Sequence, residues 1–165
     1  MRSMIVLSIL GLAVGGCGYR MSGSEGLYPD NVETVSVPTV INETFARADT
    51  ARLTSALVRQ LESRTPYRTA PLSRADTVLE VTITDIRRRM TSRDPGSSVP
   101  NEQLYVVLAD VVWKDLRTGE VLVRLENLEQ TAPLYPTLGE SDFFASQEAA
   151  EQLAIGIVEA MGGDW

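Results

Sequence analysis

The pattern of apolar and polar positions first becomes regular at residues 32–40. Val35 and Val37 alternate there with polar neighbours, which is the period of a half-buried strand. Pro38 has no backbone N–H donor, so we expect the strand to end near it or to lie at a sheet edge. The folded part of the chain is therefore predicted to begin with a strand.

Two later segments have the period of an amphipathic helix. In residues 49–64, apolar side chains recur every three or four positions, and Pro66 ends the segment. Near the C-terminus, Ser141 or Asp142 is expected to cap a helix that runs to about Met161, where two glycines end it. Each of these helices has one apolar face to bury.

Three further strands are predicted between the two helices. Residues 77–86 alternate with period two and lead into the arginines at 87–89. Residues 103–114 are apolar on both faces, which predicts that the face of this strand away from the helices is also in contact with other residues or with a partner. Residues 115–119 resemble a tight turn that contains glycine, so residues 120–130 are predicted to return as the hairpin partner.

The order of these elements is strand, helix, three strands and helix. It predicts an α+β fold, a two-layer sandwich in which two helices pack on one face of a small mixed four-stranded sheet. A loop rich in serine, proline and glycine follows the second strand, and a loop with two prolines precedes the last helix. The length fits one domain, which we expect over residues 31–165.

The N-terminal segment has the pattern of a bacterial export signal. Arg2 precedes the apolar residues 4–14, a run shorter than the roughly 20 residues that span a bilayer. A pair of small residues then leads to Cys17, the single cysteine, in a sequence that resembles a lipobox. We expect residues 1–16 to be a lipoprotein signal peptide, Cys17 to carry the acyl lipid that anchors the protein, and residues 17–30 to form a tether.

Composition and charge exclude several classes of function. The chain has 22 acidic and 15 basic residues and a net charge of −7, which argues against nucleic acid as a partner. It has no histidine and one cysteine, so common zinc sites and histidine-activated nucleophiles are excluded. We assign no catalytic residue, no metal ligand and no cofactor other than the lipid on Cys17.

Four segments, in order along the chain, resemble the lipopolysaccharide-assembly lipoproteins of the LptE type. Residues 17–23, Cys-Gly-Tyr-Arg-Met-Ser-Gly, are similar to the start of mature family members. Residues 37–44, 74–81 and 115–122 resemble the family's first strand end, second strand and central hairpin.

The resemblance implies an outer-membrane lipoprotein whose domain faces the periplasm. It also implies a role as accessory and plug subunit of an LptD-like outer-membrane β-barrel, the translocon that assembles lipopolysaccharide at the cell surface. Gly18 also favours the outer membrane, because Asp after the lipidated cysteine is an inner-membrane retention signal in some bacteria.

A cluster of arginines is the candidate site for lipopolysaccharide. Arg87, Arg88, Arg89 and Arg93 lie where the second predicted strand, residues 77–86, is expected to enter its loop. Guanidinium groups bind phosphate oxygens bidentately, so these four residues are candidate ligands for the phosphates of lipid A. In the alternative interpretation they form a solvated strand end, with Arg87 and Arg88 on opposite faces and some pairing with Asp85 or Asp94.

Tyr105 and Trp113 are candidate contacts to the barrel. They are an even number of positions apart and therefore share one face of the strand at 103–114. A core role beneath the helices is the alternative for both residues. Asn42-Glu43-Thr44 matches a glycosylation pattern, but we expect it to form an Asx or Thr cap after the first strand.

Two rival functions remain open at this point. A periplasmic adaptor or pilotin-like lipoprotein would bind a different envelope protein, for example through a sheet edge. A periplasmic hydrolase would need a cleft that holds two close carboxylates.

Overall fold

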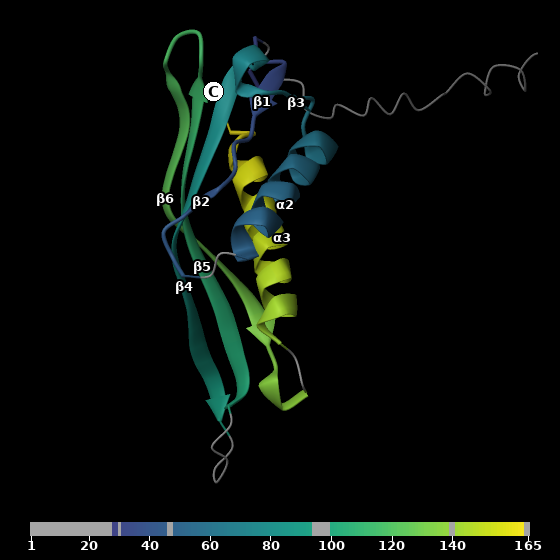
Figure 1. Cartoon of the computed structure of the whole chain (residues 1–165), viewed down its shortest axis with the longest axis vertical. Coiled ribbons are helices and arrows are strands. Elements are labelled where there is room, and N and C mark those ends of the chain that lie inside the picture. Colours follow the sequence, from purple (N-terminus) through teal and green to yellow (C-terminus); the bar gives the residue numbers. More distant parts are fainter. Residues whose placement is uncertain (1–27, 30, 46–47, 94–99, 139–140, 164–165) are drawn as a thin grey trace, which may run out of the picture.

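In the computed structural model, the described residues are 28–29, 31–45, 48–93, 100–138 and 141–163. They form two layers, a long twisted sheet and a pair of helices that lie across one of its faces (Figure 1). The elements are β1 (Thr34–Ser36), β2 (Ile41–Asn42), α2 (Ala48–Arg64), β3 (Arg68–Thr69), β4 (Thr77–Arg93), β5 (Pro100–Asp115), β6 (Val121–Leu134) and α3 (Asp142–Ala160). Short 3₁₀ turns, Leu72–Arg74 and Pro136–Leu138, complete the chain order.

The sheet is mixed, and β4 is its junction. Along the sheet the order is β3-β1-β4-β5-β6, and β2 pairs with β4 further along the same side as β1. The pairings of β1, β2 and β3 are parallel, whereas β4, β5 and β6 form antiparallel ladders. The predicted hairpin between the third and fourth strands is confirmed as the pairing of β5 with β6.

The predicted α+β class is confirmed, but the four-stranded sheet is wrong, because the sheet has six strands. The predicted first strand is divided into β1 and β2, with Pro38 in the segment between them. Proline cannot donate to a ladder, so the chain leaves the sheet there and returns at Ile41. The other strand that was not predicted, β3, has only two residues, too few to show an alternating pattern.

Two strands are longer than their patterns predict. The arginines at 87–89 lie inside β4, not at its end, because pairing with β5 holds the chain extended as far as Arg93. β6 continues past the predicted end to Leu134 and includes Pro133. A proline is tolerated there because β6 is the last strand of the sheet and its outer side needs no N–H donor.

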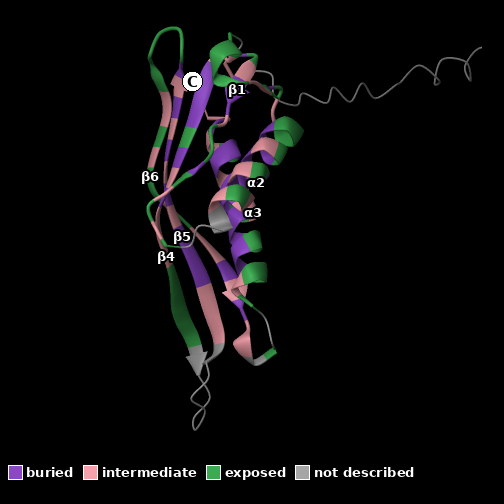
Figure 2. Cartoon of the chain, viewed as in Figure 1, coloured by how far each residue is buried: buried purple, intermediate pink, exposed green. Residues whose placement is uncertain are grey.

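The core lies between the sheet and the two helices, whose apolar faces were predicted from their spacing. Leu53, Leu57 and Leu61 of α2 are 0–1% exposed, as are Leu153 and Ile157 of α3. Figure 2 shows this buried stripe on each helix and the exposed residues on the outer sides. Neither described helix is long and apolar enough to cross a membrane.

Asp115 builds the turn between β5 and β6. Its Oδ1 accepts the backbone N–H groups of Arg117 at 2.7 Å and Thr118 at 3.0 Å. Gly119 closes the turn with φ +78°, in the left-handed region that favours glycine. The hydrogen bonds from Thr118 and Arg117 lower the pKa of the Asp115 carboxyl.

Asp76 joins the start of β4 to β1. Its Oδ2 accepts the Thr34 hydroxyl at 2.9 Å and the backbone N–H groups of Glu33 at 3.1 Å and Thr34 at 3.0 Å. These bonds favour the charged carboxylate, and the one from the Thr34 hydroxyl contributes most to lowering the pKa of Asp76.

The lowered pKa values of Asp76 and Asp115 predict a loss of stability in acid. The contribution of each carboxylate is complete above the unfolded pKa of about 4 and disappears as the pH falls through the lower folded pKa. Asp76→Asn and Asp115→Asn should therefore be less stable than the wild type at pH 7, and the difference should shrink below pH of about 4. Urea unfolding across this range measures it, with Glu80→Gln on the exposed side of β4 as the control. A difference that does not change with pH would contradict the assigned cause.

Candidate functional site

The predicted arginine cluster is divided between the two faces of the sheet. In the ladder of β4 with β5, Arg87, Arg88 and Arg89 stand opposite Val106, Tyr105 and Leu104. Successive side chains of a strand point to opposite faces, so Arg88 lies on the face that the helices cover. Arg87 and Arg89 lie on the other side, which we call the open face.

On the open face, Arg87 and Arg89 bind carboxylates of two strands. Arg87 Nη1 is 2.6 Å from Asp85 Oδ2, and its Nη2 is 3.2 Å from Glu129 Oε2 on β6. Arg89 Nη1 is 3.6 Å from the other oxygen of Glu129. Because β5 lies between β4 and β6, these ion pairs cross over β5.

This arrangement explains why β5 is apolar on both faces. Val106 is 0% exposed although it lies outside the core cluster beneath the helices. Its neighbours across the two ladders are Arg87 and Thr131, and the Arg87–Glu129 pair passes over this row. The second face of β5 is therefore covered at this point by side chains of the chain itself.

On the helix face, the guanidinium group of Arg88 pairs with Asp142 at the start of α3. Ser141 takes the predicted N-cap position, but its side chain forms no capping hydrogen bond. Two features of the alternative interpretation are thus present, namely that Arg87 and Arg88 lie on opposite faces and that Asp85 is one partner. The side chain of Arg93 lies outside the described residues, as does Asp94.

Beside Arg88, the first turn of α3 carries two aromatic side chains that the sequence reasoning missed. Phe143 and Phe144 are 52% and 64% exposed, and their ring centroids are 5.5 Å apart in an edge-to-face arrangement. The Arg52 guanidinium lies 4.5 Å from the centroid of the Phe143 ring, a cation–π contact.

We call Arg52, Arg88, Phe143 and Phe144, which lie around the start of α3, the distal patch. One signal for this patch was present in the sequence. Phe144 falls at helical spacing with Gln147, Glu148 and Glu151, so it occupies the polar face of α3, where an aromatic residue is out of pattern.

Tyr105 and Trp113 do share a face, as predicted, and it is the core face. Tyr105 is 5% exposed and Trp113 is fully buried. The Trp113 indole Nε1 donates to the Thr77 hydroxyl at 2.9 Å, and its ring lies 5.7 Å from that of Tyr67. Direct contact of these side chains with a barrel is therefore corrected to a core role, because the helices cover this face.

The described residues offer little to a hydrolase. They contain no group of three or more His, Cys, Asp or Glu that could hold a metal ion. A shallow groove of about 360 Å³ runs between α2 and α3, but its carboxylate, Glu151, accepts hydrogen bonds from Arg59 and Gln60. The adjoining groove beside Phe144 is lined by Glu151 and also by Glu148, which lies on the exposed side of α3.

The segment at residues 42–44 is the structural cap that its sequence predicts. Asn42 Oδ1 accepts the backbone N–H of Thr44 at 2.8 Å and the Thr44 hydroxyl at 2.7 Å. This Asx turn ends β2 and directs the chain away from the sheet.

The fold is shared with bacterial proteins of known structure, some of which are named as lipoproteins. Uncharacterized lipoprotein B of Nitrosomonas europaea matches with a TM-score of 0.60 and 13% identity, over 88% of this chain and 90% of that one. A PelC dodecamer from Paraburkholderia phytofirmans matches with a TM-score of 0.55 and 16% identity, over 84% of this chain and 96% of that one. A putative lipoprotein of Caulobacter crescentus matches with a TM-score of 0.52 and 11% identity, over 78% and 87% of the two chains.

The chain therefore has the two-layer α+β fold of these solved structures. The family model described as "LptE: Lipopolysaccharide-assembly" matches residues 32–161, which include all of the described helices and strands. The chain belongs to the LptE family of lipopolysaccharide-assembly proteins, as its sequence predicted. A comparison with curated proteins finds no match.

Proposed function

We propose that the protein is the accessory subunit of the outer-membrane β-barrel that assembles lipopolysaccharide at the cell surface. The lipid on Cys17 would hold it at the outer membrane, with the folded domain on the periplasmic side and seated as a plug in the barrel. The family match over residues 32–161 is the observation that carries this proposal.

Within this function, the distal patch has the chemistry to contact lipopolysaccharide. Lipid A has phosphate groups next to acyl chains, and the patch has Arg52 and Arg88 next to exposed aromatic rings. Arginine binds phosphate bidentately, and the rings supply apolar surface for acyl chains. Arg87 and Arg89 of the predicted cluster remain candidates from the neighbouring open face of β4, and Arg93 remains a candidate from the sequence alone.

The ion pairs of these arginines do not prevent such a role. The side chain of Arg88 is 55% exposed and that of Asp142 is 47% exposed. Pairs that are this exposed contribute about 0–1 kcal/mol, so a phosphate group can replace the carboxylate at small cost. Binding would thus depend on local charge, although the whole chain has a net charge of −7.

Affinity purification of the lipidated protein from detergent-solubilised envelopes of its own host tests the barrel assignment. We expect a large outer-membrane β-barrel to be recovered in near-equal amount. Recovery of soluble periplasmic proteins alone would instead support the adaptor or pilotin-like function. An empty pull-down would contradict a stable complex with the barrel.

A double variant, Arg52→Ala with Phe144→Ala, tests the distal patch. The change removes one guanidinium and one exposed ring, so binding of purified lipopolysaccharide should weaken about tenfold, while the barrel is still recovered. The matched control is Arg74→Ala with Leu72→Ala, a cation and an exposed apolar residue near the opposite end of the sheet. Equal lipopolysaccharide binding by the test and control variants would contradict a role for the patch.

A further inference from the structure

Along the second half of β4, one edge has no neighbouring strand among the described residues. β1 pairs with β4 at Thr77 and Val78, and β2 pairs with it at Thr82 and Ile83. The last backbone bond on this side runs from Glu43 N to Ile83 O at 3.0 Å. Among the described residues, no strand continues along β4 beyond that point (Figure 1).

We call the outer side of residues 85–91 the free edge. Here the ladder of β4 with β5 runs regularly from Asp85 to Met90. One register shift lies just before Asp85, and Thr91, the last residue of the free edge, lies in the next shift. A regular edge presents N–H and C=O groups outward at every second residue, ready for another strand.

The opposite edge of the sheet is protected, in contrast to the free edge. On β6, Asn127 has φ +55° and lies in an irregular part of the ladder with β5. Pro133, further along β6, has no N–H to donate. Bulges and prolines are the devices that keep edge strands from pairing, and between Asp85 and Met90 the free edge has neither.

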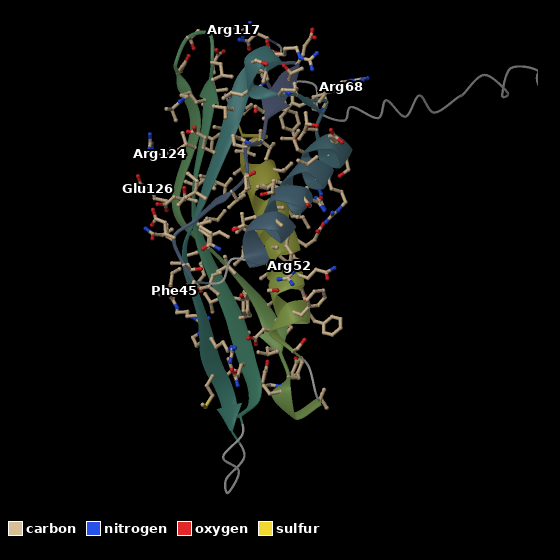
Figure 3. The ribbon with its side chains drawn as sticks, in the orientation of Figure 1. Phe45, Arg52, Arg68, Arg117, Arg124 and Glu126 are labelled. Carbon is tan, nitrogen blue, oxygen red and sulfur yellow. The ribbon has the colours of Figure 1, made fainter. Side chains whose placement is uncertain are left out.

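Exposed apolar side chains lie at both ends of the free edge. Ile41 of β2 is 60% exposed, and Phe45, three residues after the end of β2, is fully exposed. Figure 3 shows Phe45 at the side of β4 where the free edge begins. Met90 is 47% exposed at the far end. A strand laid in line with β2 would pass from Phe45 to Met90 and cover apolar surface at each end.

The free edge is positively charged, which favours an acidic partner strand over a second copy of this chain. Residues 85–90 contain three consecutive arginines, Arg87, Arg88 and Arg89, and a single acidic residue, Asp85. A second copy laid antiparallel on the same edge would place arginines opposite arginines, and like charges across a ladder are destabilising. A strand with carboxylates would instead meet three guanidinium groups that are 46–55% exposed, and it would exchange with their present partners Asp85, Glu129 and Asp142.

We propose that the free edge of β4 receives an extended acidic segment of a partner protein as an added strand. Its backbone would pair with β4 in line with β2, and its carboxylates would meet Arg87 and Arg89 on the open face or Arg88 on the helix face. This inference does not depend on the barrel assignment, since any envelope protein with such a segment fits the edge.

The test adds a synthetic ten-residue peptide of alternating valine and glutamate to the full lipidated protein in detergent micelles. Hydrogen exchange of backbone amides is the readout, because only an added strand protects the outer amides of residues 85–91. A peptide with lysine in place of glutamate is run beside it. We expect protection of residues 85–91 by the glutamate peptide, and little by the lysine peptide.

A charge-reversed variant, Arg87→Glu with Arg89→Glu, completes the test. Its affinity for the glutamate peptide should fall about tenfold, and the lysine peptide should now protect the edge. Arg124→Glu on β6, at the other side of the sheet, is the control and should bind as the wild type does. The exchange of peptide preference also shows that the variant is folded.

Three outcomes would overturn the proposal. They are no protection of residues 85–91 at saturating peptide, equal protection by both peptides, and unchanged affinity in the charge-reversed variant. None of them affects recovery of the barrel, so a failure here is distinct from a failure of the proposed function.

Discussion

Replacing Trp113 by alanine is expected to lower the free energy of unfolding by about 3–5 kcal/mol. The side chain is fully buried, and its ring packs against Tyr67. Its indole N–H also donates to the Thr77 hydroxyl, which in turn donates to the Thr34 carbonyl at 3.3 Å. The substitution therefore opens a large cavity and leaves a buried hydroxyl short of one partner.

Urea or thermal unfolding of the purified domain measures this loss. Leu72→Ala is the matched control, because that side chain is 57% exposed and its removal should change the stability by less than about 0.5 kcal/mol. A loss below about 1 kcal/mol for Trp113→Ala would mean that the site collapses around the missing ring, and it would contradict the packing described here.

Replacing Cys17 by alanine is expected to move nearly all of the protein from the membrane fraction to the soluble fraction. Two or three acyl chains, at about 0.8 kcal/mol per buried methylene, form a stable anchor, and without the thiol no chain can be attached. The melting temperature of the domain should not change, because the core lies between the sheet and the two helices. Membrane fractionation, with mass spectrometry of the N-terminal peptide, measures both attachment and lipidation.

The Trp113→Ala protein serves as the control for Cys17→Ala. It retains the thiol, so its folded fraction should remain in the membrane even though its domain is less stable. Membrane attachment of Cys17→Ala, or a wild-type N-terminal peptide without added lipid mass, would contradict the lipoprotein assignment.

Features that depend on near neighbours in the chain could be predicted. The helix predicted at residues 49–64 from apolar spacing and a proline stop is α2, which begins one residue earlier, at Ala48. The β5–β6 hairpin follows from a glycine turn between two apolar runs. The placement of Arg87 and Arg88 on opposite faces needed only the period of a strand. These are properties of short stretches, in which local geometry decides the conformation.

Features that depend on distant parts of the chain could not be predicted. β3 is a strand only because two residues meet β1, and β4 stays extended to Arg93 only because β5 pairs with it. Likewise, Glu129 and Asp142 lie 42 and 54 positions away from their partners Arg87 and Arg88 in the sequence.

By itself, the sequence determined the α+β class, the two helices, the central hairpin and the expected lipid anchor at Cys17, because each is encoded by local periodicity or by a contiguous motif. Only the tertiary structure decided the order of the six strands, the burial of Trp113, the distal patch and the free edge of β4. Each of these depends on which segments, far apart in the chain, come to lie side by side. A single sequence carries no direct record of such contacts.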